Sequence, residues 1–351
     1  MTFTNLKQSM KSNDKPMATI KDVAKAAGVS TATVSRALFD SEKVTESTRE
    51  KVAKAVADIG YSPNVAARHL RRRETNSIMV ILPDISNSFF SDVISGVEKV
   101  ARTAGYKVLL GDLSHDTNRA KDFFDLVPTN QSDGLILLTS DIEHALLKDR
   151  QIGSGFPVVM ACEYVEDMSL PTVRIDNQSA AGKAIEYLIS LGHQNIATVT
   201  GPMQNPICRD RQEGLLEQLK KNGLPFQYSN MREGDFSFAS GYEHGRTLLE
   251  QQDRPTAIFC HNDEMAIGVI KAARDLDIIV PAELSVIGFD NIAFGEYCEP
   301  ELTTVNQPRE DIGKQAMKTL LNILGDKDAS LLHTPRTDLI VRGSTGICPK
   351  R

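Results

Sequence analysis

Polar and aromatic side chains follow several short apolar runs of the sequence, where strands would end. They are Asp84, Phe89 and Phe90 after residues 78–83, Asp176 and Asn177 after 173–175, Arg209 and Arg211 after 197–200, His261, Asn262 and Asp263 after 257–260, Asp290 and Asn291 after 286–289, and Gln307 after 303–305. Ligands of open parallel sheets bind beyond the carboxyl ends of the strands. Rings stack on a flat group, and a carboxylate such as Asp290 can accept hydrogen bonds from two hydroxyls, as a ribose diol offers. The set predicts a site for a small polar molecule with hydroxyls and one flat ring.

Two simpler interpretations of these residues stay open. Asp and Asn are favoured at helix N-caps whether or not a ligand binds, so Asp176, Asn177 and Asp263 could be caps. One ring of the pair Phe89 and Phe90 could belong to the hydrophobic core.

Catalytic motifs do not accompany this set. The sequence has no G-x-G-x-x-G after a strand, no phosphate-binding G-x-x-x-x-G-K-[ST], no H-E-x-x-H and no G-x-S-x-G. Its seven His lack metal spacing, and its five Cys are far apart and never in C-x-x-C spacing, which indicates reduced thiols. We therefore expect no catalytic residue, no metal and no cofactor. A dinucleotide enzyme remains an alternative by analogy of fold alone.

A second set of residues could recognise DNA. Thr31, Ala32, Ser35 and Arg36 lie on the outer face of a helix predicted over residues 31–38. Arg can read guanine O6 and N7 with two hydrogen bonds, Thr can contact a base or phosphate, and Ala can pack on a thymine methyl. These residues predict a recognition helix in the major groove.

Two further helices would position that face. Thr19 and Asp22 form a capping-box pattern for a helix that Gly28 ends, and Ser30 caps the second helix, so that only three or four residues separate the two helices. A third helix is expected to be capped near Ser47, with Glu50 three residues on. This pattern is typical of a helix-turn-helix, although a generic three-helix bundle with a polar surface is the alternative.

Charge separates the chain into two parts. Residues 1–73 hold 14 Lys and Arg against 7 Asp and Glu, and residues 74–351 hold 26 against 39. A basic head on an acidic body indicates that the head meets a polyanion, unless it is a basic tail with no partner.

The 351 residues suggest two or three domains. After residue 77, short β-branched runs alternate with helical periods, and the pattern restarts near Asn177, which predicts two similar parallel-sheet lobes. The expected fold class is an all-α helix-turn-helix head plus an α/β body.

Apolar runs reach only five residues and the N-terminus has no signal-peptide stretch, so we expect no membrane segment and a cytoplasmic location. Residues 1–16 read as a disordered extension, and Met17 could be the natural start.

Two stretches of the head identify a family. "MATIKDVAKAAGVSTATVSRAL" and "VTESTREKVAKAVADIGYSPNVAARHL" resemble the head of the lactose/purine-repressor (LacI/GalR) family almost residue by residue. In the body, "NSFFSDVISGVE", "HNDEMAIG", "VIGFDNI" and "LTTVNQPREDIG" resemble that family's ligand-binding core, itself similar to periplasmic sugar-binding proteins. The resemblance covers residues 17 to about 345.

The resemblance implies a domain plan and site residues. A DNA-binding domain is expected over 17–63, a hinge helix over 64–75 and a two-lobe ligand-binding and dimerisation domain over 76–345, with an N-lobe of about 76–176 and 308–333 and a C-lobe of about 177–306 and 336–345. Asn64, Leu70 and Arg71 would bind DNA from the hinge, with Leu70 wedged in the minor groove, although a floppy basic linker fits when DNA is absent. The residues expected to line the pocket are Phe89, Phe90, Arg211, Phe236, Asn262, Asp290 and Gln307.

The function that the resemblance implies is sequence-specific transcriptional repression controlled by an effector in the cleft between the lobes. The body is most similar to members that respond to nucleosides, which implies a nucleoside, with cytidine expected. A purine base or a sugar is the alternative effector. A nucleoside- or sugar-binding protein that does not bind DNA, such as a periplasmic one, is a further alternative. The expected partners are a palindromic operator, a second copy of the chain and, from resemblance alone, a cAMP receptor protein co-bound on DNA.

Overall fold

The computed structural model describes residues 18–39, 41–61, 75–114, 116–142, 146–147, 156–325 and 332–350. The chain divides into two compact units, Met1–Arg73 and Glu74–Arg351. The predicted extension over 1–16, the possible start at Met17 and nearly all of the predicted hinge over 64–75 lie outside the described residues.

Three helices form the first unit: α1 (Ile20–Ala27), α2 (Thr31–Phe39) and α3 (Glu46–Ile59). Val23, Val34 and Val52, one from each helix, are fully or almost fully buried together. These positions leave the polar residues of each helix on the outside, as an amphipathic pattern requires.

The ends of these helices follow their capping residues. The Thr19 amide donates to the Asp22 carboxylate at 2.9 Å, and the Thr33 amide donates to Ser30 Oγ at 3.1 Å, so both predicted caps are present. The cap expected near Ser47 was wrong, because the N-cap of α3 is Thr45 and the helix begins at Glu46. An acidic residue directly after the cap suits the positive end of a helix dipole, which explains the earlier start.

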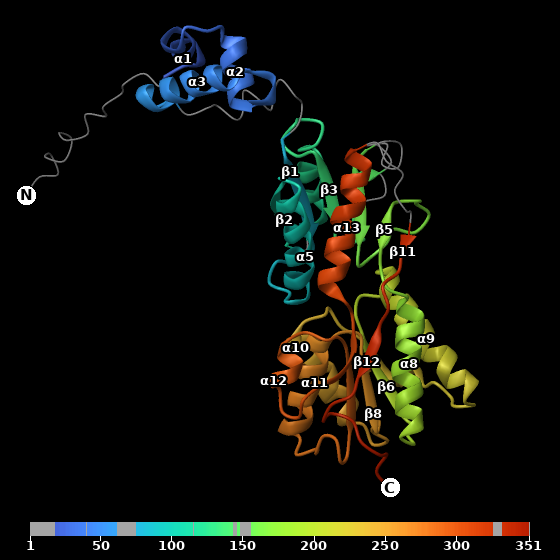
Figure 1. The fold of residues 1–351 in the computed structure, drawn as a ribbon. Helices are drawn as coiled ribbons and strands as arrows, with labels where there is room; N and C mark the ends of the chain where they lie inside the picture. Colours follow the sequence, from blue (N-terminus) through green and yellow to red (C-terminus); the bar gives the residue numbers. More distant parts are fainter. Residues whose placement is uncertain are drawn as a thin grey trace, which may run out of the picture. The chain divides into compact units, whose positions relative to one another are not determined.

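The second unit contains two six-stranded sheets (Figure 1). We call the sheet ordered β11-β5-β4-β3-β1-β2, with its helices α5, α6 and α13, the N-lobe, and the sheet ordered β12-β10-β9-β8-β6-β7, with α8 to α12, the C-lobe. The strand bounds in the N-lobe are β1 Ser77–Leu82, β2 Lys107–Asp112, β3 Gly134–Leu137, β4 Val158–Ala161, β5 Thr172–Val173 and β11 Leu332–His333. Those in the C-lobe are β6 Ile196–Thr200, β7 Met231–Glu233, β8 Ala257–Cys260, β9 Ser285–Asp290, β10 Thr303–Asn306 and β12 Asp338–Ile340.

Helices cover both faces of each sheet. The helix bounds are α5 Phe89–Thr103, α6 Ala120–Phe124, α13 Arg309–Leu324, α8 Asn177–Ser190, α9 Pro206–Lys221, α10 Phe238–Leu249, α11 Asp263–Asp275 and α12 Phe294–Tyr297. Helix α5 packs against α13, α8 against α9, and α10 against α11. Buried Val80 and Leu82 of β1 face the α5 and α13 side, whereas Met79 and Ile81 face the side of α6, as strand alternation requires.

The sequence predicts strands over residues 78–83, 108–111, 135–139, 158–161, 197–200, 257–260 and 286–289, and all seven are present. The prediction of two parallel-sheet lobes is confirmed. One departure is β12, which is antiparallel to β10. The short β7, β11 and β12 were not predicted, since two or three residues give no readable period.

The chain passes between the lobes after β5, after β10 and after β11. The second passage brings α13, from late in the chain, beside α5 (Figure 1). A Cβ atom at Gly96 would clash with the Glu310 carbonyl, and one at Gly313 would clash with the Val93 carbonyl. These two glycines therefore allow the helices to touch along their backbones.

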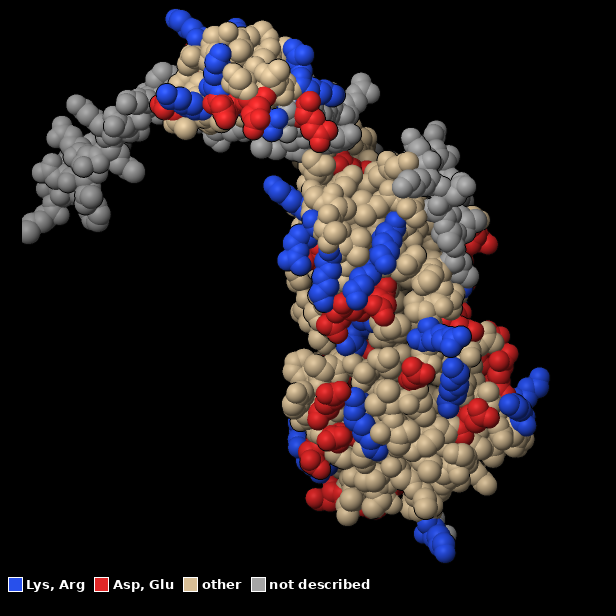
Figure 2. Space-filling view, in the orientation of Figure 1, with Lys and Arg blue, Asp and Glu red and all other residues tan. Residues whose placement is uncertain are grey.

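Surface charge on the N-lobe is not evenly spread. Figure 2 shows Lys and Arg side chains gathered on the face that carries β2, α5 and α13, with acidic side chains at the end nearest the C-lobe. Glu310 of α13 pairs with Lys99 of α5 at 2.8 Å and with Lys314 at 2.6 Å.

In the described part of the chain, no helix has the length and apolar character needed to cross a membrane.

Candidate functional site

The outer face of α2 carries the predicted DNA contacts. Thr31, Ala32 and Arg36 are exposed and Ser35 is half-buried, whereas Val34 faces the core. Arg36 Nε donates to the Ala32 carbonyl at 3.3 Å. The four side chains share one surface of a helix, the geometry by which a helix can enter the major groove. The other three predicted DNA contacts, Asn64, Leu70 and Arg71, lie outside the described residues.

In the second unit, the predicted ligand residues come from both lobes. Phe89 and Phe90 begin α5 of the N-lobe, are both buried, and pack edge to face with their centroids 5.1 Å apart. Both rings thus pack in the hydrophobic core, whereas the simpler interpretation left open from the sequence placed only one of the two there. The other five, on the C-lobe side, are Arg211, Phe236, Asn262, Asp290 and Gln307.

Asp290 ends the central strand β9 in a strained conformation. Its φ of 111° is in the region that side-chain-bearing residues avoid, while the φ of Asn291, 57°, is in the left-handed region that Asn tolerates. Such a residue costs about 1–3 kcal/mol and persists only where its surroundings hold it. Here Gln307 Nε2 donates to Asp290 Oδ1 at 2.6 Å, and the Ile292 amide donates to the buried Asp263 at 2.8 Å.

Burial raises the pKa of Asp290 to about 6, and the nearby Arg211 and Arg309 oppose that rise. The carboxylate is nearly buried, with one oxygen held by Gln307. Asp290 is therefore a hydrogen-bond acceptor that is charged at neutral pH and becomes protonated as the pH falls through about 6.

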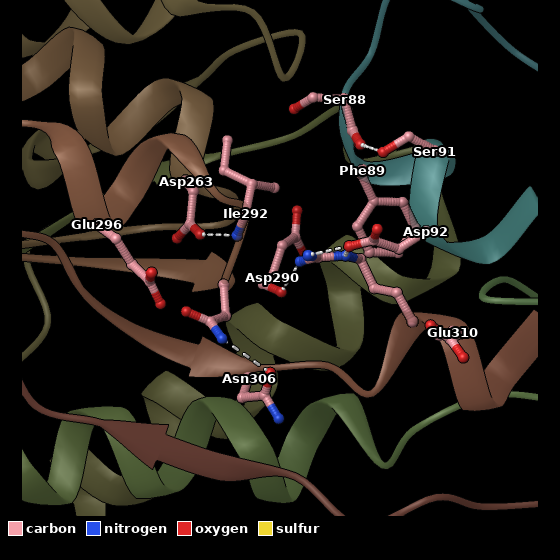
Figure 3. Close-up of polar contacts among 12 residues, drawn as sticks. Ser88, Phe89, Ser91, Asp92, Asp263, Asp290, Ile292, Glu296, Asn306 and Glu310 are labelled. Atoms are coloured by element: carbon pink, nitrogen blue, oxygen red, sulfur yellow. Dashed lines mark hydrogen bonds and ion pairs between the residues drawn. The ribbon is translucent and has the colours of Figure 1, made fainter. Parts of the chain in front are cut away.

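Arg309, the first residue of α13, ties Asp290 to the N-lobe. Its Nη1 donates to the Asp290 carbonyl, and its Nη2 and Nε contact Asp92 Oδ2 of α5 at 2.6 and 3.2 Å. Its guanidinium lies 6.0 Å from the centre of the Phe89 ring. Figure 3 shows Asp290 facing Phe89 and Asp92 across this bridge.

Arg211 is buried and largely engaged by protein groups. Its Nε donates to Asn177 Oδ1 at 2.8 Å, its Nη1 donates to the His261 carbonyl, and its guanidinium stacks 3.8 Å from the Phe289 ring centre. Asn177 therefore supports Arg211 rather than capping α8, whose cap is Asp176.

Asn262 links two candidate residues. Its Oδ1 accepts from the Met265 amide at 3.0 Å and so caps α11, while its Nδ2 donates to the Phe236 carbonyl at 2.8 Å. This arrangement fixes Phe236, whose φ of 69° is also unusual.

Buried polar atoms beside Arg211 have no partner among the described residues. They are both ring nitrogens of His261 and Asn177 Nδ2. Burial and the charge of Arg211 lower the pKa of His261 well below its usual value, so its ring is neutral and can donate and accept.

Pairs across the two lobes were missed by sequence reasoning. Ser88 Oγ donates to Glu264 at 2.9 Å, Asn205 Nδ2 to Glu163 at 2.8 Å, and Tyr164 Oη to Asp210 at 3.0 Å. The partners are 42 to 176 residues apart in the chain, so no local sequence pattern indicates that they pair. Together they set how the carboxyl ends of the two sheets meet.

Two grooves of the described surface are lined by residues of the C-lobe helices and their caps. One, of about 440 Å³, runs between α8 and α9, and the other, of about 310 Å³, is lined by residues of α10 and α11. The described residues contain no group of three or more His, Cys, Asp and Glu that could hold a metal ion.

Known proteins resemble both units. Residues 19–64 match the family described as bacterial regulatory proteins, lacI family, and residues 185–345 match a periplasmic binding protein-like domain. The HTH-type transcriptional repressor CytR of Escherichia coli (strain K12) is 42% identical over 95% of this chain and 97% of its own. Catabolite control protein A of Priestia megaterium is 37% identical over 90% of this chain and 96% of its own. The HTH-type transcriptional repressor PurR of Vibrio vulnificus is 35% identical over 89% of this chain and 93% of its own.

Among solved structures, the lac repressor dimer bound to operator and the anti-inducer ONPF matches with a TM-score of 0.84 at 26% identity, covering 94% of this chain and 99% of that one. A transcriptional regulator CelR–cellobiose complex matches with a TM-score of 0.71 at 27% identity, covering 93% of this chain and 99% of that one.

Proposed function

Because the chain belongs to the LacI family of bacterial regulatory proteins, we propose that it is a DNA-binding transcriptional repressor whose operator affinity is set by a small effector bound between its lobes. One observation carries the proposal: a single chain joins a three-helix unit with Thr31, Ala32 and Arg36 exposed on α2 to a two-lobe unit with the charged acceptor Asp290 where the lobes meet. The head would read DNA and the body would sense the ligand.

The operator is a palindromic duplex bound by a homodimer. One recognition helix reads one half-site, so a two-fold operator requires a two-fold protein. Residues 17–63 form the DNA-binding domain, and 64–75 form the hinge, with Asn64, Leu70 and Arg71 at the minor groove. A helix over residues 64–70 would have only seven residues and would be marginal alone, so a change in lobe arrangement can decide whether the two hinges are helical together.

The effector is a nucleoside, with cytidine as the first candidate. Asp290 can accept hydrogen bonds from a ribose diol, the rings of Phe89, Phe90 and Phe236 can contact a base, and Asn262, Gln307 and Arg211 would fix its orientation. The relative named CytR, at 42% identity, supports a cytidine-class ligand. A purine base or a sugar is the second candidate, supported by the relative named PurR and by the CelR–cellobiose complex.

Two binding experiments test these proposals on the full chain. Fluorescence anisotropy should detect binding to a palindromic duplex that weakens steeply as salt rises, because phosphate contacts release counterions. Calorimetry with cytidine, uridine, adenosine, hypoxanthine, guanine, ribose and cellobiose should show that cytidine binds most tightly. Binding that is equal for all duplexes would refute sequence-specific repression, and tighter binding of a purine base or a sugar would replace the nucleoside.

Co-binding with a cAMP receptor protein remains a prediction. It would appear as cooperative protection of adjacent sites in a footprint that contains both proteins.

A further inference from the structure

We propose that Arg309 is the positioning residue that reports occupancy of Asp290 to the N-lobe, because its guanidinium holds the Asp290 backbone on one side and Asp92 of α5 on the other. The inference rests on the proposed function, since it assumes that the effector binds the Asp290 carboxylate. It assigns a role to a residue that contacts the protein rather than the ligand.

The geometry of Asp290 makes its backbone sensitive to its side chain. The carboxylate is held by Gln307 at 2.6 Å, while the carbonyl of the same residue is held by Arg309 Nη1. With φ at 111°, Asp290 stays in place only through such contacts. A ligand that pulls on the carboxylate therefore changes the geometry of the carbonyl that Arg309 grips.

The N-lobe end of the bridge is equally specific. Arg309 contacts Asp92 Oδ2 through two nitrogens, at 2.6 and 3.2 Å, and its side chain is only 10% exposed. Asp92 lies in the first turn of α5, the helix that starts with Phe89. A planar guanidinium with several donors can hold a carbonyl and a carboxylate at once, which a lysine ammonium does less rigidly.

The helices behind the bridge are closely packed. Gly96 and Gly313 let α5 and α13 pack backbone to backbone, so a displacement of Arg309 must move α5 as a unit or break the ion pair (Figure 1). Asn291, next to Asp290, is anchored within the C-lobe, because its side chain bonds Asn306 and Arg342. Arg309 is thus the described contact through which the Asp290 backbone reaches α5.

A neighbouring ion pair provides a matched control. Glu310, the next residue, joins the same two helices through Lys99 at 2.8 Å, but no described hydrogen bond or ion pair links it to Asp290. Glu310→Gln removes one charge from this pair as Asp92→Asn removes one from the Arg309 pair.

The first measurement needs no ligand. Hydrogen–deuterium exchange of the full-length protein should show faster exchange over residues 290–293 in Arg309→Gln and in Asp92→Asn, and wild-type exchange in Glu310→Gln. Unchanged exchange in Asp92→Asn, or equal acceleration in Glu310→Gln, would overturn the proposal.

The second measurement uses cytidine. The ratio of operator Kd with and without saturating cytidine should fall at least fivefold in Arg309→Gln and in Asp92→Asn, and the double variant should lose no more than Arg309→Gln alone. Additive losses, or an equal loss in Glu310→Gln, would refute the relay. If the wild type does not respond to cytidine, the proposed effector fails, and the exchange measurement decides the role of Arg309 alone.

Discussion

Asp290 combines two properties that suit a ligand-binding carboxylate, a strained backbone and a pKa raised to about 6. The groups that act on its charge are Arg211, Arg309, Gln307 and Glu264. Its ionised form can accept two hydroxyl hydrogen bonds, and its protonated form loses part of that capacity.

Effector affinity should therefore depend on pH. Because the pKa of Asp290 is raised from 3.8 to about 6, the carboxyl is ionised above pH 6 and becomes protonated as the pH falls through 6. We expect cytidine affinity to be constant near pH 8 and to fall by up to about tenfold per pH unit below 6. Calorimetry from pH 8 to pH 5 measures this.

Asp290→Asn serves as the control for that titration. It should bind cytidine about 10–100-fold more weakly at pH 8, since a hydrogen bond to a charged group contributes about 1.5–3 kcal/mol, and its weaker binding should not vary with pH. His261 cannot imitate the effect, because its lowered pKa keeps it neutral over this range. A wild-type profile that is flat down to pH 5 would remove Asp290 from the effector site.

Arg36 should determine operator preference. Arg36→Ala removes a side chain that is exposed on the outer face of α2, so the fold of the head should survive. We expect specific affinity to fall by about 1–3 kcal/mol, while affinity for an unrelated duplex changes much less. Lys54→Ala, at an exposed position of α3, should not weaken binding to the specific duplex more than binding to the unrelated duplex. Equal loss for both duplexes in Arg36→Ala would identify a phosphate contact instead.

Residue patterns predicted some of these roles and not others. Asp290 and Gln307 stood out because they follow apolar strands, and the structure joins them by a hydrogen bond. Arg309 and Asp92 did not stand out, because each resembles an ordinary charged residue in the first turn of a helix, and they are 217 residues apart in the chain. Backbone strain at Asp290 has no sequence signal either, since it results from the packing around the residue.

At the scale of elements, periodicity and capping predicted the three head helices and the longer strands of both sheets, but not the short β7, β11 and β12. The capping box at Thr19 and Asp22 is local, so it could be read directly. The pairing of α5 with α13 could not, because it depends on how the chain returns to the N-lobe after β10. Gly96 and Gly313 mark that contact only once the two helices are known to touch.

The close contact of α5 and α13 should be sensitive to a single methyl group. Gly313→Ala places a Cβ against the Val93 carbonyl, so the helices must separate. Overpacking of this kind typically destabilises a protein by about 1–3 kcal/mol. Urea unfolding should show this decrease in the free energy of unfolding, whereas Lys318→Ala, at an exposed position of α13, should leave it within about 0.5 kcal/mol. A Gly313→Ala protein as stable as Lys318→Ala would mean that the helices can shift apart without loss.

At the scale of the whole molecule, the C-lobe carries an apolar surface suited to a second copy of the chain. Tyr297 is 85% exposed, Phe294 58% and Phe238 41%, and the last two rings pack edge to face with centroids 6.3 Å apart. The groove between α10 and α11 continues this surface through Phe238 and Ile267. Exposed aromatic clusters of this kind mark interfaces, where aromatic residues are enriched.

Tyr297→Asp should therefore convert the proposed homodimer to a monomer. A charge placed in an apolar interface loses its hydration without gaining a partner, which weakens association strongly. A monomer would reach only one half-site, so affinity for a palindromic operator should fall by at least 100-fold while affinity for an isolated half-site stays the same. Analytical ultracentrifugation and anisotropy measure the two effects. Tyr228→Asp is the matched control, because Tyr228 is 77% exposed on another part of the C-lobe. The Tyr228→Asp protein should remain dimeric. A dimer that survives Tyr297→Asp would place the interface elsewhere on the chain.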